Sequence, residues 1–131
     1  MLTRTGIGKN AKLCIMELKD EYEAPNKVLM QALAYTVFVR ELLRSNSGNM
    51  WWELFGFNRS GNNPLSPQKP LALFSACVMP TSEKLDADKS FAGNALEIEG
   101  DVIELHYVYF KENDNKIESI WSSLPHTMPK G

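Results

Sequence analysis

Hydrophobic and polar residues first form a clear pattern in the sequence KLCIMELK, at residues 12–19. In a β-strand the odd-numbered positions of this stretch would face one side and the even-numbered positions the other. The apolar run at 13–16 predicts burial on both faces, as in the central strand of a sheet covered by helices. Glu17 and Lys19 would then project together from the end of a buried strand.

A long helix is predicted next, over residues 27–44, with Pro25 or Asn26 as its entry. At 100° per residue, Thr36, Arg40 and Arg44 form one polar stripe, which we expect to face solvent. Most of the remaining positions are apolar. The sequence NSGN at 46–49 supplies a helix stop signal.

Strands dominate the predictions for the rest of the chain. Residues 50–57, MWWELFGF, are rich in aromatic side chains and predict an extended segment. Residues 58–70 have turn chemistry and predict an exposed loop. Residues 71–79 predict a second buried strand, 95–99 and 102–110 a hairpin with a turn at Gly100 and Asp101, and 117–121 a further strand. This order favours an α/β fold with a mixed central sheet and a long helix packed on one face.

Length and composition suit one globular unit. The 131 residues are 44% hydrophobic and 23% charged, which predicts a single domain over 1–131 with one core and a tail at 125–131. Cys14 and Cys77 lie within apolar runs, where a free thiol behaves as a small hydrophobic side chain, and this favours a reducing cytoplasm. No stretch reaches the roughly 18 apolar residues of a membrane span. The net charge of −2 gives no global support for a polyanionic partner, so a DNA site would have to be a local patch.

Glu17 and Lys19 are the first candidates for chemistry. Residues i and i+2 of a strand share a face about 7 Å apart. Mg²⁺ prefers oxygen ligands, which the Glu17 carboxylate and the Leu18 carbonyl could supply, while Lys19 could orient a water molecule or neutralise charge on a phosphate. On spacing alone, two charges that meet solvent or pair with each other are the favoured interpretation.

The sequence QALAY adds a second pair of candidates. Gln31 and Tyr35 are four residues apart and share a helix face. Phe38 and Leu42 fall on either side of Gln31, which predicts that its amide lies within the apolar stripe and needs partners. The alternative is that Gln31 bonds a neighbouring backbone group and Tyr35 is an ordinary core residue.

Together, ELK at the end of a hydrophobic strand and the following helix with Gln-x-x-x-Tyr resemble the PD-(D/E)xK nuclease superfamily, especially its RecB-like branch. The resemblance covers residues 12–44. It implies a restriction-endonuclease-like core and Mg²⁺- or Mn²⁺-dependent hydrolysis of DNA. By position, Glu17 becomes a metal ligand with the Leu18 carbonyl, and Lys19 the catalytic lysine. Gln31 and Tyr35 become the adjoining pair that contacts DNA or supports the site.

The chain departs from that family at one point. The family pattern places an Asp on the strand before ExK, whereas residues 1–16 contain no Asp or Glu. Three explanations stay open: a fragment whose missing N-terminal part carried the acid, a degenerate relative, or replacement by Asp20, Glu21 or Glu23. The turn predicted at 6–10, GIGKN, favours a core that lacks its first elements.

The remaining candidates are weaker. His106 alternates with apolar residues and is interpreted as structural, and Trp51 and Trp52 as packing at the end of the long helix. The resulting hypotheses are a DNA-cleaving nuclease or a degenerate relative of one, and a non-catalytic module that binds nucleic acid or protein on the same scaffold. A homo-oligomer formed through an exposed sheet edge is a third hypothesis.

Overall fold

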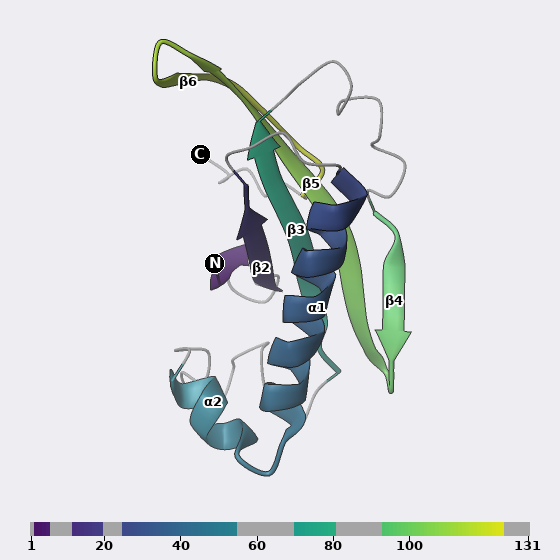
Figure 1. The fold of residues 1–131 in the computed structure, drawn as a ribbon. Helices are drawn as coiled ribbons and strands as arrows, with labels where there is room; N and C mark the ends of the chain where they lie inside the picture. The colour runs from purple at the N-terminus through teal and green to yellow at the C-terminus, as the bar shows by residue number, and fades with distance from the viewer. Residues whose placement is uncertain (1, 6–11, 20–24, 55–69, 81–92, 125–131) are drawn as a thin grey trace, which may run out of the picture.

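The computed structural model describes residues 2–5, 12–19, 25–54, 70–80 and 93–124. Within these ranges the chain forms a mixed six-stranded sheet and two helices (Figure 1). The elements are β1 (Leu2–Thr5), β2 (Lys12–Leu18), α1 (Pro25–Arg44), α2 (Gly48–Leu54), β3 (Ala72–Pro80), β4 (Ala95–Ile98), β5 (Asp101–Asn113) and β6 (Lys116–Ser122). The predicted α/β class is confirmed.

The strand order places the ELK strand inside the sheet. The order is β1-β2-β3-β5-β4, and β6 also pairs with β5. Strands β2, β3 and β5 are parallel, whereas β1, β4 and β6 run antiparallel to their neighbours. Because parallel strands need a long crossover, α1 connects β2 to β3 and begins at the end of the sheet where β2 finishes (Figure 1).

The apolar run at 71–79 forms the central strand β3, as predicted. Its residues are buried at all but two positions. On the α1 side of the sheet the core contains Leu13, Ile15, Leu43, Trp52, Leu71, Leu73 and Ile103. A second cluster on that side joins Val28 and Leu29 to Cys77, Met79, Tyr107 and Tyr109, and Cys14, Phe74, Ala76 and Leu124 pack on the opposite face. Burial on both faces explains why this strand does not alternate with polar residues.

The prediction that Thr36, Arg40 and Arg44 face solvent is wrong. Thr36 and Arg40 are 0% and 4% exposed, and the stripe faces the sheet. The Thr36 hydroxyl donates a hydrogen bond to the carbonyl of Ala32 (2.7 Å). Both arginines bind Asp101, which lies far along the chain at the start of β5. Helical periodicity correctly placed the three residues on one line, but a counter-charge distant in sequence decides that the line is buried.

The extended segment predicted at 50–57 is also wrong over its described part, where α2 extends to Leu54. Trp52 is fully buried, which confirms that this aromatic pair packs near the end of α1. The N–H of Gly48 donates to the carbonyl of Ser45 (2.9 Å) in the tight turn between the helices. A Cβ at Gly48 would collide with the carbonyl oxygen of Leu43, so this turn requires glycine.

The hairpin predicted around Gly100 forms from β4 and β5, and the strand predicted at 117–121 lies within β6. The turn predicted at 6–10, most of the loop at 58–70 and the tail at 125–131 lie outside the described residues. Neither described helix is long and apolar enough to cross a membrane.

Candidate functional site

Glu17 and Lys19 lie at the carboxyl end of β2, where β2 is still paired with the central strand. Glu17 is opposite Cys77 in the register with β3, and the N–H of Lys19 donates to the carbonyl of Val78 (2.9 Å). Because Leu13 and Ile15 pack into the core on the α1 side, the same alternation directs Glu17 and Lys19 to that side. The structure therefore places both side chains at the end of the sheet where α1 begins.

The two side chains form an ion pair. Lys19 Nζ lies 3.5 Å from Glu17 Oε1, and the side chains are 26% and 18% exposed. The pairing considered from the sequence as the simplest interpretation is thus present. An ion pair at a partly exposed position contributes about 0–1 kcal/mol to stability. The fold therefore gains little stability from the pairing of Glu17 with Lys19.

The described strands beside this ion pair offer few further oxygen ligands. Lys19 directs its N–H toward β3, so Leu18 directs its N–H and carbonyl to the other side of β2, toward β1. The ladder between β1 and β2 ends with Leu2 opposite Ile15, so no described residue of β1 lies opposite Glu17. Among the residues that the structure describes, no group of three or more His, Cys, Asp and Glu side chains could hold a metal ion.

Gln31 and Tyr35 are on the surface of α1, so the prediction of a buried Gln31 amide is wrong. Gln31 is exposed, and Tyr35 and Phe38 are 53% and 62% exposed. The side of α1 that carries Arg40 and Arg44 faces the sheet. The apolar stripe around Gln31, which was predicted to be in the core, therefore lies partly on the outer face of α1.

The rotation of α1 nevertheless turns Tyr35 toward β2. Tyr35 and Arg44 are nine residues apart, which is about 180° around a helix. Arg44 binds Asp101 beside β4, and β2 and β4 lie on opposite sides of α1 (Figure 1). Tyr35 and Gln31, one turn before it, are therefore on the flank of α1 that is nearer to β2.

A buried charge cluster around Asp101 was missed from the sequence. Asp101 is 2% exposed and accepts hydrogen bonds from Arg40 Nε (3.0 Å) and Arg44 Nη2 (2.7 Å). Burial raises the pKa of Asp101, but hydrogen bonds from Arg44, the Leu71 N–H and Arg40 outweigh it, so the pKa falls below its ordinary value. The cluster joins α1 to the start of β5, and we assign it a structural role. The only signal of this cluster in the sequence was that an acidic residue, Asp101, follows the glycine of a predicted turn.

Burial also opposes the charge of Arg40. Hydrogen bonds to Glu99, Glu41 and Asp101 outweigh this effect, and the pKa of Arg40 is raised. The guanidinium therefore stays charged within the cluster.

His106 joins a second polar group on the other face of the sheet. Its Nδ1 lies 2.8 Å from Ser123 Oγ and its Nε2 lies 2.9 Å from Glu104 Oε1. A serine, a histidine and a carboxylate in series suggest a nucleophile, but Ser123 Oγ also accepts from the Tyr107 N–H (3.0 Å) and His106 is 2% exposed. The group joins the end of β6 to β5, and the structural role of His106 stays a prediction.

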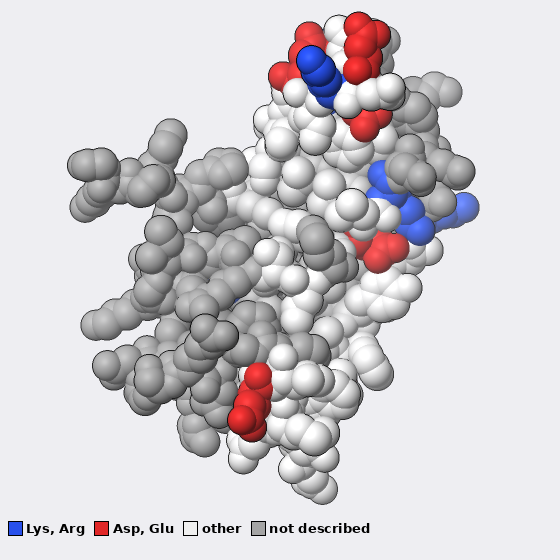
Figure 2. All heavy atoms as spheres, turned by 90° about the vertical axis from the view of Figure 1, so that its left-hand side faces the viewer, with Lys and Arg blue, Asp and Glu red and all other residues white. Residues whose placement is uncertain are grey.

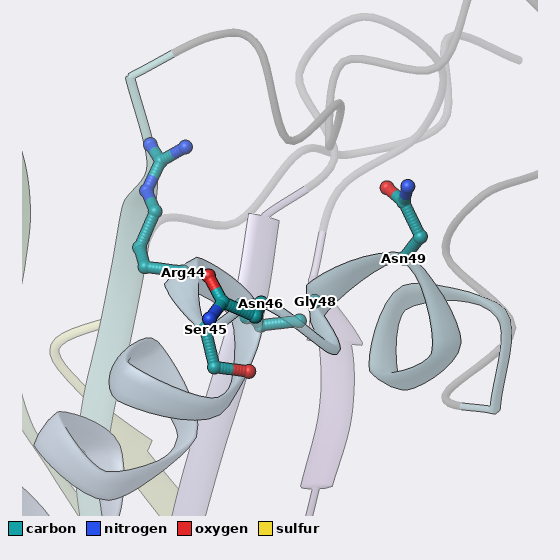
Figure 3. A pocket seen from close by; sticks show the side chains of 6 residues that line it. Arg44, Ser45, Asn46, Gly48 and Asn49 are labelled. Carbon is teal, nitrogen blue, oxygen red and sulfur yellow. The ribbon is translucent and has the colours of Figure 1, made fainter.

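Two further features carry no assigned chemistry. Burial raises the pKa of both Cys14 and Cys77 to about 12, so these free thiols are poor nucleophiles. A hollow of about 180 Å³ lies at the turn between α1 and α2, lined by Leu43, Arg44, Ser45, Asn46, Gly48 and Asn49 (Figure 3). Arg44 at its rim is already bound to Asp101.

Figure 2 shows the side of the molecule that carries β2 and α2. The described residues there form mostly uncharged surface; some basic and acidic groups adjoin one another, and one acidic group near the bottom of the view lies apart from any basic group. Comparison of the chain with protein-family models, curated proteins and solved structures finds no match.

Proposed function

We propose that the chain acts on the phosphodiester backbone of DNA at the carboxyl end of β2, as a PD-(D/E)xK-type nuclease or a degenerate relative of one. The observation that carries this proposal is the position of Glu17 and Lys19 on the α1 side of a central strand, at the end where α1 begins. Gln31 and Tyr35 lie on the flank of α1 nearer to β2. The β2–α1–β3 crossover, with β1 antiparallel to β2, is compatible with a restriction-endonuclease-like core.

In this proposal Glu17 and the Leu18 carbonyl would hold Mg²⁺ or Mn²⁺. A divalent cation bound there would polarise the phosphate that is cleaved. Lys19 would place its ammonium against a phosphate oxygen or orient the attacking water, exchanging its ion pair with Glu17 for these contacts. Gln31 and Tyr35 are exposed and would contact the DNA beside the site.

The ligand set supports only weak binding of the cation in the absence of DNA. Mg²⁺ usually keeps several waters and is held by one or two carboxylates together with substrate phosphates. Among the described residues Glu17 is the one carboxylate of this set, so DNA would have to supply the further ligands. We expect little Mg²⁺ binding to the protein alone and a clear increase when DNA is present.

Nicking of supercoiled DNA in Mg²⁺ or Mn²⁺, with EDTA as the metal-free control, tests the catalytic form of this proposal. Glu17→Gln and Lys19→Met should each abolish nicking while the thermal unfolding curve stays close to that of the wild type. Lys111→Met and Glu118→Gln are the matched controls, because Lys111 and Glu118 form another ion pair at 3.5 Å, on β5 and β6. Equal nicking by both site variants and the wild type would remove Glu17 and Lys19 from the mechanism.

A non-catalytic module that binds nucleic acid or protein is the second candidate. It is favoured by the ion pair, because Lys19 neutralises the one carboxylate that would hold the cation. Fluorescence anisotropy with labelled DNA in EDTA separates the two forms. Metal-independent binding that weakens in Lys19→Met, together with no nicking in Mn²⁺, would support the module and exclude the nuclease.

A further inference from the structure

The outer face of α1 carries apolar side chains that the sheet does not cover. Met30 and Phe38 are each 62% exposed, and Ala34 lies exposed between them. Single exposed apolar residues are common on protein surfaces and need no explanation. Here, however, positions 30, 34 and 38 recur at helical spacing, so they form one stripe along the helix.

This stripe has a symmetric sequence. Met30 and Phe38 lie four residues before and after Ala34, and Lys27 and Glu41 lie seven residues before and after it. Seven residues return to almost the same helix face, so Lys27, Ala34 and Glu41 are in line. Lys27 is exposed, and the Glu41 side chain is 60% exposed although one oxygen pairs with Arg40. The stripe therefore has opposite charges at its two ends.

We propose that this face of α1 binds a second copy of the chain, with the two helices antiparallel and a two-fold axis beside Ala34. In that arrangement Lys27 meets the partner's Glu41 at both ends of the contact. Met30 and Phe38 of the two copies lie at the same level along the helix axes. A two-fold contact uses the same patch on both copies, which the symmetric stripe provides.

Charge decides the direction of the two helices. A parallel pair would place Lys27 against Lys27 and Glu41 against Glu41, whereas the antiparallel pair places opposite charges together. Ala34 at the centre allows a close approach, toward the short end of the 8–10 Å range of helix packing distances.

The expected association is weak. A helix of 20 residues is about 30 Å long. A contact about 10 Å wide would bury roughly 300 Å² per copy, whereas stable interfaces bury roughly 800 Å² per partner. We therefore expect a monomer–dimer equilibrium that is visible only at protein concentrations of roughly 10 µM to 1 mM.

Sedimentation equilibrium of the full chain across that range tests the proposal by charge exchange. Lys27→Glu and Glu41→Lys should each raise the dimer Kd roughly tenfold at low salt, because each reversal acts at both ends of the contact. The double variant K27E/E41K should return the Kd to within about threefold of the wild type. Failure of the double variant to recover, with an unchanged circular dichroism melt, would overturn the pairing.

Two exposed residues of equal exposure provide a matched pair of variants. Phe38→Ser should weaken the dimer, and Ile120→Ser on β6, also at a 62% exposed position, should not. Among the described strands β6 pairs only with β5, so a dimer formed through the β6 edge would show the reverse result. That reverse result, or a wild type that stays monomeric at 1 mM, would refute the α1 contact.

Crosslinking gives a separate geometric test. Ala34→Cys should form an intermolecular disulfide on mild oxidation, because the two copies of residue 34 meet at the axis. Lys27→Cys should not, since its two copies would be 14 residues, or about 21 Å, apart along the helices. The native cysteines are buried and do not compete. Neither variant touches Glu17 or Lys19, so this proposal and the nuclease proposal can fail separately.

Discussion

Replacement of Asp101 by Asn removes the charge at the centre of the buried cluster while keeping the shape of the side chain. Asp101 accepts hydrogen bonds from Arg40 Nε (3.0 Å) and from Arg44 Nε and Nη2 (3.0 and 2.7 Å). It also accepts the N–H of Leu71 (2.8 Å), immediately before β3. The variant therefore weakens three contacts to charged donors and leaves two arginines facing a neutral amide.

The loss of stability in Asp101→Asn depends on the contacts that Arg40 and Arg44 keep. Removal of one member of a buried ion pair costs about 3–5 kcal/mol. Arg40 keeps Glu41 (2.6 Å) and Glu99 (3.1 Å), and Arg44 is partly exposed, so we expect the lower end of this range, about 3 kcal/mol. The free energy of unfolding of a typical domain is about 5–15 kcal/mol, so this loss is a large part of it. For a chain of this length it should lower the Tm by roughly 10 °C.

Urea denaturation followed by tryptophan fluorescence measures this loss, because Trp52 is fully buried and reports on the same core. The midpoint should fall with little change in the m-value. Glu99→Gln is the control, since the Glu99 side chain is 84% exposed and pairs only with Arg40 among the described ion pairs, and it should cost less than about 1 kcal/mol. A loss below about 1 kcal/mol for Asp101→Asn would refute the argument that the cluster holds α1 to β5.

The same cluster predicts how stability depends on pH. The pKa of Asp101 is lowered in the folded state from its ordinary value of 3.8. Its contribution is therefore complete above that value and is lost as the pH falls through the lower folded-state pKa. The difference between wild type and Asp101→Asn should shrink in acid, and a difference that stays constant down to about pH 2 would contradict the assigned pKa shift.

Three smaller perturbations test other parts of the structure. Gly48→Ala should destabilise the chain by about 1–3 kcal/mol in urea denaturation, because the added Cβ meets the Leu43 carbonyl; no change would show that the turn relaxes easily. Iodoacetamide at pH 8 should leave Cys14 and Cys77 unmodified until urea unfolds the chain, as mass spectrometry would detect, whereas rapid native labelling would disprove their burial. Ser123→Ala should cost about 1–2 kcal/mol, because the Tyr107 N–H loses its acceptor, and a neutral result would exclude a clamp at the end of β6.

The two buried strands and the long helix could be predicted from the sequence, because their patterns are local. Four apolar residues in a row at 13–16 and the run at 71–79 indicated strands covered on both sides, and β2 and β3 occupy these positions. Alternation along β2 was also sufficient to place Glu17 and Lys19 on one face. Their roles in catalysis stay predictions, since side-chain position alone does not establish a reaction.

Residues 48–54 show where local pattern was insufficient. Their aromatic content is typical of strands, but Trp52 gains its burial as part of a short helix against the end of α1. Helix and strand can both bury a tryptophan, so the choice depends on the surface that receives it. Apart from Leu43 at the end of α1, the buried residues of that surface are far away in the chain, in β2, immediately before and within β3, and in β5.

The sequence by itself determined the positions of α1 and of strands β2 to β6, and which residues share a face of α1 and of β2, whereas β1 was not predicted. Only the tertiary structure decided which face of α1 is inside. Arg40 and Arg44 face the sheet because they bind Asp101, which is 61 and 57 residues away in the sequence. The resulting orientation of α1 about its axis exposes Tyr35 and Phe38. The periodicity of a helix or strand shows which of its residues share a face. Whether a charged face is buried depends on a counter-charge from a distant part of the chain, which comes close only when the chain folds.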